Sequence, residues 1–123
     1  MPSNAVVHRW AALDLDKVTE LISRKIVSGE RQMLVQVYLK RGAHVPAHRH
    51  VSEQLQYVLE GALRCMVGGE EIVVHEGEVL VIPAGVRHQA EALADTFALD
   101  LFCPVRTEWL APTGGGPAGD PPR

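Results

Sequence analysis

Seven short apolar or alternating runs, separated by glycine and proline, constrain the fold of this chain more than any other feature. Their lengths suit β-strands and are too short for most helices. The breaks between them contain Gly61, Gly68-Gly69, Gly77 and Pro83-Ala84-Gly85, and these residue types favour tight turns. Many short strands at this spacing predict an all-β sandwich or barrel. The predicted strands are Met33–Lys40, Glu53–Glu60, Ala62–Val67, Glu70–His75, Val79–Ile82, His88–Ala92 and Thr96–Cys103.

The two ends of the chain differ from this pattern. Leu13–Lys25 is the one stretch compatible with a turn of helix, and we expect residues 1–30 to form an N-terminal arm of mixed structure. The barrel is then expected over residues 31–111. Residues 112–123 are rich in glycine and proline, which predicts a disordered tail.

Composition excludes several classes of partner. A chain of 123 residues with 46% hydrophobic content is expected to form one domain around one core. A net charge of -3 without a basic run argues against nucleic acid. No apolar stretch approaches the roughly 20 residues that span a bilayer. The first residues lack the order of a secretory signal, so we expect a cytoplasmic protein without a membrane partner.

Two cysteines, Cys65 and Cys103, lie in separate predicted strands. They do not have the spacing of metal ligands. We expect both to be buried, reduced thiols.

Four side chains have a spacing that suits one divalent metal ion. Residues two apart in a strand share a face, so His48 and His50 can point to one place, and Gln54 has the same parity. With His88 they would form a set of three imidazoles and one amide oxygen, which suits Mn, Fe, Co, Ni or Zn better than Ca or Mg. The absence of thiolates disfavours a closed structural zinc site. No ligand carries a charge, so the bound ion should attract anions.

A lone carboxylate interrupts the apolar run of the last predicted strand. Burial of Asp100 would require a partner, a hydrogen-bond network or a raised pKa. Beside a metal in a cavity, such a carboxylate is a candidate general acid or base. Arg106 could bind either Asp100 or an anionic substrate. The residues alone leave open an ion pair that only fixes the end of the chain.

One predicted strand has an apolar outer face. Gln54 and Gln56 share the side of the metal ligands, whereas Leu55, Tyr57 and Leu59 lie on the other side. An apolar face is costly to leave in water. We expect the N-terminal arm, a second copy of the chain, or both to cover it, which predicts a homodimer. The alternative is that the second sheet of the same chain covers it.

Two motifs resemble the two-part signature of the cupin superfamily over residues 33–110. The first extends from Gly42 through His48 and Gln54 to Gly61, and the second from Gly77 through Pro83 to His88. The resemblance implies a jelly-roll β-barrel, or double-stranded β-helix. Most cupins have a glutamate where this chain has Gln54.

A narrower resemblance concerns the segment from Asp100 to Leu110. It is similar to the carboxyl-terminal segment of KdgF-type cupins, which linearise unsaturated uronates during pectin and alginate breakdown. That resemblance implies an active site with Asp100, Phe102 and Arg106 beside a metal. The metal ligands would be His48, His50, Gln54 and His88.

The activity implied is a ring-opening and tautomerisation of 4,5-unsaturated monouronates to linear keto sugars. Arg106 would hold the carboxylate of this small anionic substrate, Asp100 would move a proton, and Phe102 would shape the pocket. Gln56 could contact sugar hydroxyls. Two alternatives remain open, a metal-dependent dioxygenase and a non-enzymatic cupin that binds a sugar or another anion.

Overall fold

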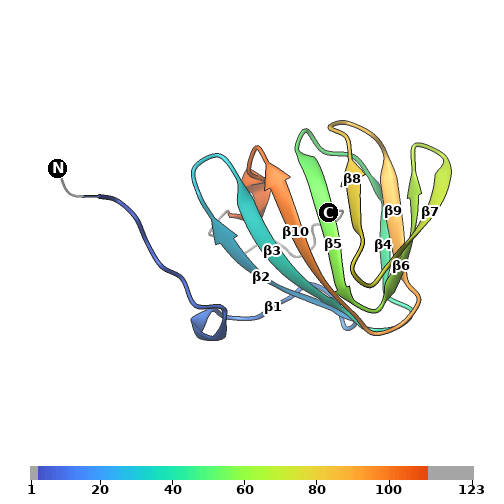
Figure 1. Ribbon diagram of the computed structural model, residues 1–123, viewed down its shortest axis with the longest axis horizontal. Helices are drawn as coiled ribbons and strands as arrows, with labels where there is room; N and C mark the ends of the chain where they lie inside the picture. Colours follow the sequence, from blue (N-terminus) through green and yellow to red (C-terminus); the bar gives the residue numbers. More distant parts are fainter. Residues whose placement is uncertain (1–2, 111–123) are drawn as a thin grey trace.

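The computed structural model describes residues 3–110, which form two antiparallel β-sheets (Figure 1). The larger sheet has the order β1-β2-β3-β10-β5-β8, and the smaller has the order β4-β9-β6-β7. No helix between residues 3 and 110 is long and apolar enough to cross a membrane. The predicted tail at 112–123 lies outside the described residues. The elements are η1 (Trp10–Ala12), β1 (Asp16–Lys17), β2 (Ile22–Ser28), β3 (Met33–Leu39), β4 (His44–His48), β5 (Glu53–Glu60), β6 (Ala62–Val67), β7 (Glu70–His75), β8 (Val79–Ile82), β9 (His88–Ala92), β10 (Thr96–Cys103) and η2 (Thr107–Trp109).

Six of the seven predicted strands have the observed bounds, and the remaining one, β3, ends one residue earlier than predicted. The strands β1, β2 and β4 were not predicted. The helical turn expected within Leu13–Lys25 is wrong, because β1 and the first part of β2 occupy that stretch. β2 lies in the stretch assigned to the arm, yet it pairs with β3 along its whole length, from Ile22 opposite Leu39 to Ser28 opposite Met33. Its interior face carries Arg24 among apolar residues, which weakens the alternation that marks a strand.

The core contains two apolar clusters. The larger is built around Val58 and Leu63, and both side chains are fully buried. The smaller contains Met33, Val35 and Phe102. Each fully buried side chain of this size contributes about 1.5 to 3 kcal/mol relative to exposure. Met33 pairs with Phe102 across β3 and β10, so the smaller cluster lies where β10 ends.

The two cysteines differ in exposure. Both thiols are free, but Cys65 is buried whereas Cys103 is exposed. The prediction of a buried thiol is therefore correct for Cys65 and wrong for Cys103. Residues of β10 alternate between the interior and the outside, and Cys103 falls on the outer parity at the end of the strand.

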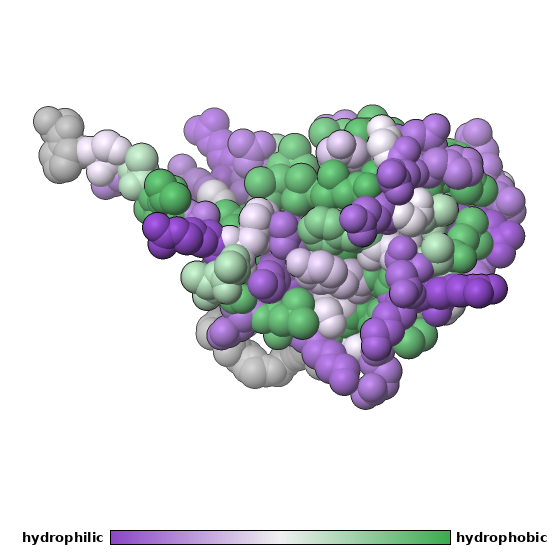
Figure 2. All heavy atoms as spheres, turned by 60° about the horizontal axis from the view of Figure 1, so that its bottom comes forward, coloured by the Kyte–Doolittle hydropathy of each residue, from purple (hydrophilic) through white to green (hydrophobic). Residues whose placement is uncertain are grey.

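The outer face of β5 is apolar, as predicted. Gln54 and Gln56 are buried on the inner side, whereas Tyr57 is 38% exposed on the outer side. Its neighbour Val79, opposite in β8, is 53% exposed. The second sheet packs on the inner side, so it does not cover this face. Apolar side chains gather in patches on the surface of the molecule (Figure 2).

The N-terminal segment does not cover this face either. Residues 3–9 are exposed. Figures 1 and 2 both show the segment before η1 projecting away from the barrel. Of the three elements that the sequence suggested could cover this face, only a second copy of the chain remains.

We expect the chain to form a homodimer through the outer face of β5 and β8. Analytical ultracentrifugation at micromolar concentration should give the mass of two chains. Val79→Lys should give the mass of a single chain, because the substitution would bury a charge at the interface. Val51→Lys is the control, since Val51 is also exposed but lies in the loop before β5. A monomeric wild-type protein would contradict the expectation.

The turn between β5 and β6 depends on Gly61. Its φ is +94°, a region that other residues rarely adopt. A Cβ atom there would meet the backbone oxygen of Asp95 and Oγ1 of Thr96 at 2.5 Å. The same hydroxyl of Thr96 contacts the backbone N–H of Ala62, so it is not free to move aside.

Gly61→Ala should lower the free energy of unfolding by about 3 kcal/mol, because backbone strain and a steric clash add together. Gly69→Ala is the matched control. Gly69 has a φ of +90°, but a Cβ atom there would meet nothing within 4 Å. Strain alone should therefore cost about 1 kcal/mol at that position. Urea denaturation measures both values, and equal losses would contradict the role of the contact with Thr96.

Candidate metal centre

Three histidines converge at one point of the barrel. The side-chain nitrogens that His48, His50 and His88 offer as ligands all lie within 4.8 Å of one another. His48 ends β4 and pairs directly with His88, the first residue of β9. His50 lies in the following loop rather than in a strand. The predicted convergence is confirmed, but strand parity is not its cause, because the chain leaves β4 at His48.

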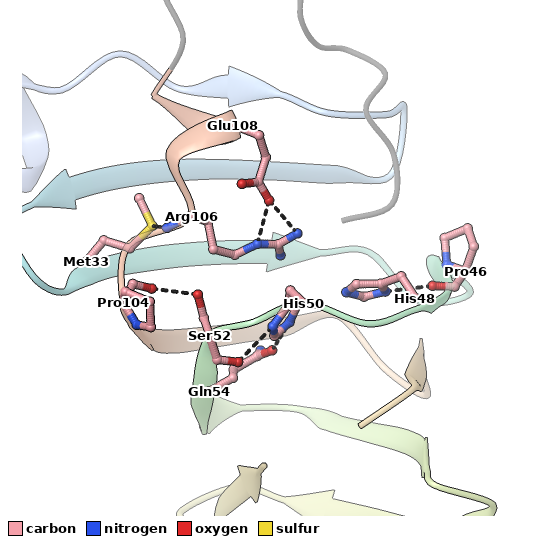
Figure 3. A network of polar contacts seen from close by, with 9 residues as sticks. All are labelled: Met33, Pro46, His48, His50, Ser52, Gln54, Pro104, Arg106 and Glu108. Carbon is pink, nitrogen blue, oxygen red and sulfur yellow. Dashed lines mark hydrogen bonds and ion pairs between the residues drawn. The ribbon is translucent and has the colours of Figure 1, made fainter. Parts of the chain in front are cut away.

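Each of these imidazoles is oriented by a backbone carbonyl two residues away. Nδ1 of His48 lies 2.9 Å from the oxygen of Pro46, and Nδ1 of His50 lies 2.9 Å from that of Ser52 (Figure 3). Nδ1 of His88 lies 2.8 Å from the oxygen of Val86. A carbonyl can only accept a hydrogen bond, so each Nδ1 carries the proton and each Nε2 keeps a lone pair. This arrangement is typical of histidines that bind metal through Nε2.

The surroundings of the three imidazoles also favour their neutral form. Desolvation by burial lowers the pKa of His48 to about 3 and that of His50 to about 4. Burial likewise lowers the pKa of His88, and the positive charge of Arg106 lowers all three pKa values. Neutral imidazoles can bind a metal ion without first releasing protons.

The donor atoms fit a transition metal. Nε2 of His88 is buried and has no hydrogen-bond partner among the described residues, which is unusual for such an atom. Oε1 of Gln54 lies 3.2 Å from Nε2 of His50. Neighbouring ligands that lie about 2.1 Å from one metal ion are roughly 3 Å apart. His48, His50, Gln54 and His88 could therefore hold one divalent ion.

A cavity of about 230 Å³ adjoins these ligands. The four further residues predicted for the active site all line it, and all are buried. The rest of its wall is largely apolar and comes from both sheets. The four residues are Gln56, Asp100, Phe102 and Arg106.

Asp100 lies on the interior face of β10, opposite Gln56 of β5. Its Oδ1 atom is buried without a hydrogen-bond partner among residues 3–110. Burial raises the pKa of Asp100 to about 7, although the amides of Gln54 and Gln56 and the charge of Arg106 act in the opposite direction. A carboxyl with this pKa can both donate and accept a proton near neutral pH.

Arg106 follows β10 and is held at the edge of the cavity. Its Nε and Nη2 atoms both lie 3.0 Å from Oε2 of Glu108 (Figure 3). Its guanidinium also lies over two rings, 4.2 Å from the centroid of Trp109 and 5.4 Å from that of Phe102. From the sequence, Asp100 or a substrate was predicted as the partner of Arg106, and Glu108 was not. The reason is that the 3-10 turn η2 brings Glu108 back toward Arg106.

Several cavity residues were missed from the sequence, and two of them contact each other. Arg24 of β2 and Trp109 of η2 both line the cavity. Arg24 was placed in the arm because β2 was not predicted. The signal that could have located it is its position between Ile22 and Ile26, which places it on the inner face once β2 is taken as a strand.

These features define a class, a jelly-roll barrel with a cluster of histidines in its interior that could hold a metal ion. Residues 35–104, more than half of the chain, match the Cupin domain family. The protein belongs to the cupin family, and the predicted fold class is confirmed.

The chain is similar to KdgF from a Halomonas species, with 32% identity, a TM-score of 0.81 and coverage of 86% of this chain and 99% of that one. An RmlC-like cupin from Shewanella frigidimarina NCIMB 400 shares the fold, with 23% identity, a TM-score of 0.80 and coverage of 89% and 99%. An uncharacterised protein of Methanocaldococcus jannaschii is 28% identical over 87 residues, which are 70% of this chain and 69% of that protein.

The histidine cluster predicts binding of one transition metal ion per chain. Titration calorimetry with Zn²⁺ should give one site, and His88→Ala should weaken it about 100-fold or more, since even indirect contacts to a metal are worth about 10- to 100-fold. His75→Ala is the control, because His75 is exposed and pairs with Glu78 away from the cluster. Unchanged affinity in His88→Ala would contradict the assignment.

Proposed function

We propose that this cupin is a metal-dependent enzyme that opens and tautomerises 4,5-unsaturated uronates, giving linear keto sugar acids. One observation carries the proposal. Asp100, a buried carboxyl with a pKa raised to about 7, lines the same cavity as Arg106 and three of the four candidate metal ligands, His48, Gln54 and His88. The similarity to KdgF supports the substrate class.

The four ligands would hold the metal ion. When bound, the ion supplies electrostatic stabilisation of negative charge that develops on a substrate oxygen. His48, His50, Gln54 and His88 contribute no negative charge of their own, since the imidazoles are neutral and Gln54 is an amide.

Arg106 would bind the substrate carboxylate. Its partner Glu108 has a side chain that is 56% exposed, and an exposed ion pair contributes little. A substrate carboxylate could therefore replace Glu108 at low cost and keep the paired geometry that a guanidinium favours. Phe102 is buried and contacts both Arg106 and His50, and it would limit how deeply the sugar ring enters.

Asp100 would transfer the proton. Opening of the cyclic hemiacetal removes a proton from the anomeric hydroxyl and breaks the bond between the anomeric carbon and the ring oxygen, which leaves as an enolate oxygen on C5. Tautomerisation returns the proton to C4 and gives the keto group, so the overall reaction is an isomerisation. One carboxyl can perform both steps if its pKa lies near the working pH. Gln56, which faces Asp100 across β5 and β10, could orient a sugar hydroxyl.

A metal-dependent dioxygenase is the second candidate. The observation that favours it is the cluster of three imidazoles within 4.8 Å, since histidines also bind the iron of oxygenases. Oxygen consumption by the iron-loaded protein distinguishes this candidate from uronate isomerisation, which consumes no oxygen.

The proposed reaction predicts that the metal-loaded protein accelerates loss of the absorbance of the unsaturated bond in 4,5-unsaturated galacturonate. Asp100→Asn should lower kcat by about 100-fold or more, because it removes the proton carrier and keeps the size of the side chain. Its metal content should not change.

Asp14→Asn is the matched control, since Asp14 is exposed and lies outside the cavity. Full turnover by Asp100→Asn would rule out the proton-transfer role. No acceleration by the wild-type protein with any of the candidate metals would rule out the reaction itself.

A further inference from the structure

Arg24 is a buried guanidinium on the wall of the cavity. It lies on the inner face of β2 between Ile22 and Ile26, and it is only 8% exposed. It lines the same cavity as Asp100 and Arg106. A buried charge requires partners, so the contacts of Arg24 indicate what else it could bind.

The contacts within residues 3–110 satisfy only part of the hydrogen-bonding capacity of Arg24. Its Nε donates a hydrogen bond of 2.9 Å to Oδ2 of Asp16, its cross-strand neighbour in β1. Its guanidinium lies 4.1 Å from the ring centroid of Trp109. The two terminal nitrogens, Nη1 and Nη2, donate no hydrogen bond to any residue between 3 and 110. These are the atoms with which arginine binds carboxylates in a paired geometry.

Trp109 places Arg24 close to Arg106. The two guanidinium carbons lie 4.1 and 4.2 Å from the centroid of this one ring, so they are within about 8 Å of each other. The ring of Trp109 contacts Phe102, with centroids 5.1 Å apart, and Phe102 contacts His50 at 5.6 Å. Two positive charges in the cavity wall therefore contact the same ring, and packed rings connect them to the histidine cluster.

Each guanidinium has an acidic partner that is largely in solvent. The side chain of Asp16 is 53% exposed and that of Glu108 is 56% exposed. Exposed carboxylates neutralise such charges weakly. A ligand carboxylate inside the cavity, where less water competes, would interact more strongly with both arginines.

We propose that Arg24 and Arg106 together form an anion subsite that binds the carboxylate of the ligand, and that Asp16 competes for Arg24. The substrate class, a monouronate, rests on the proposed function. The cavity of about 230 Å³ favours one sugar-acid ring, since pockets for larger, drug-sized ligands measure about 300 to 1,000 Å³.

The test is the binding of D-galacturonate and D-galactose to the Zn²⁺-loaded protein, measured by titration calorimetry. The two sugars differ in charge at one carbon, and neither has the unsaturated bond, so no turnover is needed. Wild-type protein should prefer galacturonate. Arg24→Gln should weaken galacturonate binding by about 10- to 100-fold and leave galactose binding unchanged.

Arg64→Gln is the matched control. Arg64 lies on β6, where it forms an exposed ion pair with Glu91. It does not line the cavity. Its substitution should change the affinity for neither sugar.

Asp16→Asn provides an independent test that does not remove the arginine. It should tighten galacturonate binding several-fold, because Arg24 loses its competing carboxylate. The same change in an Arg24→Gln background should have no effect. A purely structural role of the pair would give the opposite result, with weaker binding in Asp16→Asn.

The proposal is overturned if Arg24→Gln binds galacturonate as the wild-type protein does, if Asp16→Asn weakens binding, or if the wild-type protein does not distinguish the two sugars. The experiments distinguish failure of the proposed reaction from failure of the anion subsite. Arg24-dependent binding without turnover of unsaturated galacturonate would retain the subsite and reject the reaction. Turnover with an unchanged KM in Arg24→Gln would retain the reaction and reject the subsite.

Discussion

The pairing of β10 along both of its edges is the constraint on which the site depends. β3 lies on one side and β5 on the other, and the register forces every second residue of β10 into the interior. Asp100 is buried for this reason, despite the cost of burying a carboxyl. A slip of one residue would turn Asp100 and Phe102 outward and would place Leu99 and Leu101 inside. The same register places Gln56 opposite Asp100.

The interior of the barrel contains both the apolar clusters that stabilise the fold and the charged groups that line the cavity. Apolar clusters around Val58 and Met33 hold the sheets together, while the cavity between the sheets keeps polar and charged groups that no packing argument requires. His48, His50 and His88 are neutral, and Arg24 and Arg106 are cations. Among residues 3–110, Asp100 is the one acidic side chain that lines the cavity. Such a cavity favours an anion, and local departures from good packing of this kind are expected at functional sites.

Much of the barrel could be predicted from local patterns. The strands from β5 to β10 show alternation or short apolar runs, and glycines with positive φ, such as Gly61 and Gly77, mark the turns between them. β2 and β4 escaped prediction because Arg24 interrupts one apolar pattern and Pro46 lies within the other. Cys103 was misplaced because its outer parity in β10, opposite to that of Asp100 and Phe102, was not taken into account.

The amino-acid sequence by itself determined β3 and the strands from β5 to β10, the family, and the identity of the histidines and the buried carboxylate, because residue period, turn chemistry and motif spacing are local properties. Only the tertiary structure decided that His50 reaches the metal centre from a loop, that Glu108 pairs with Arg106, and that Arg24 lines the cavity. Those contacts join segments whose proximity depends on how the two sheets and the chain ends pack, which no local pattern encodes.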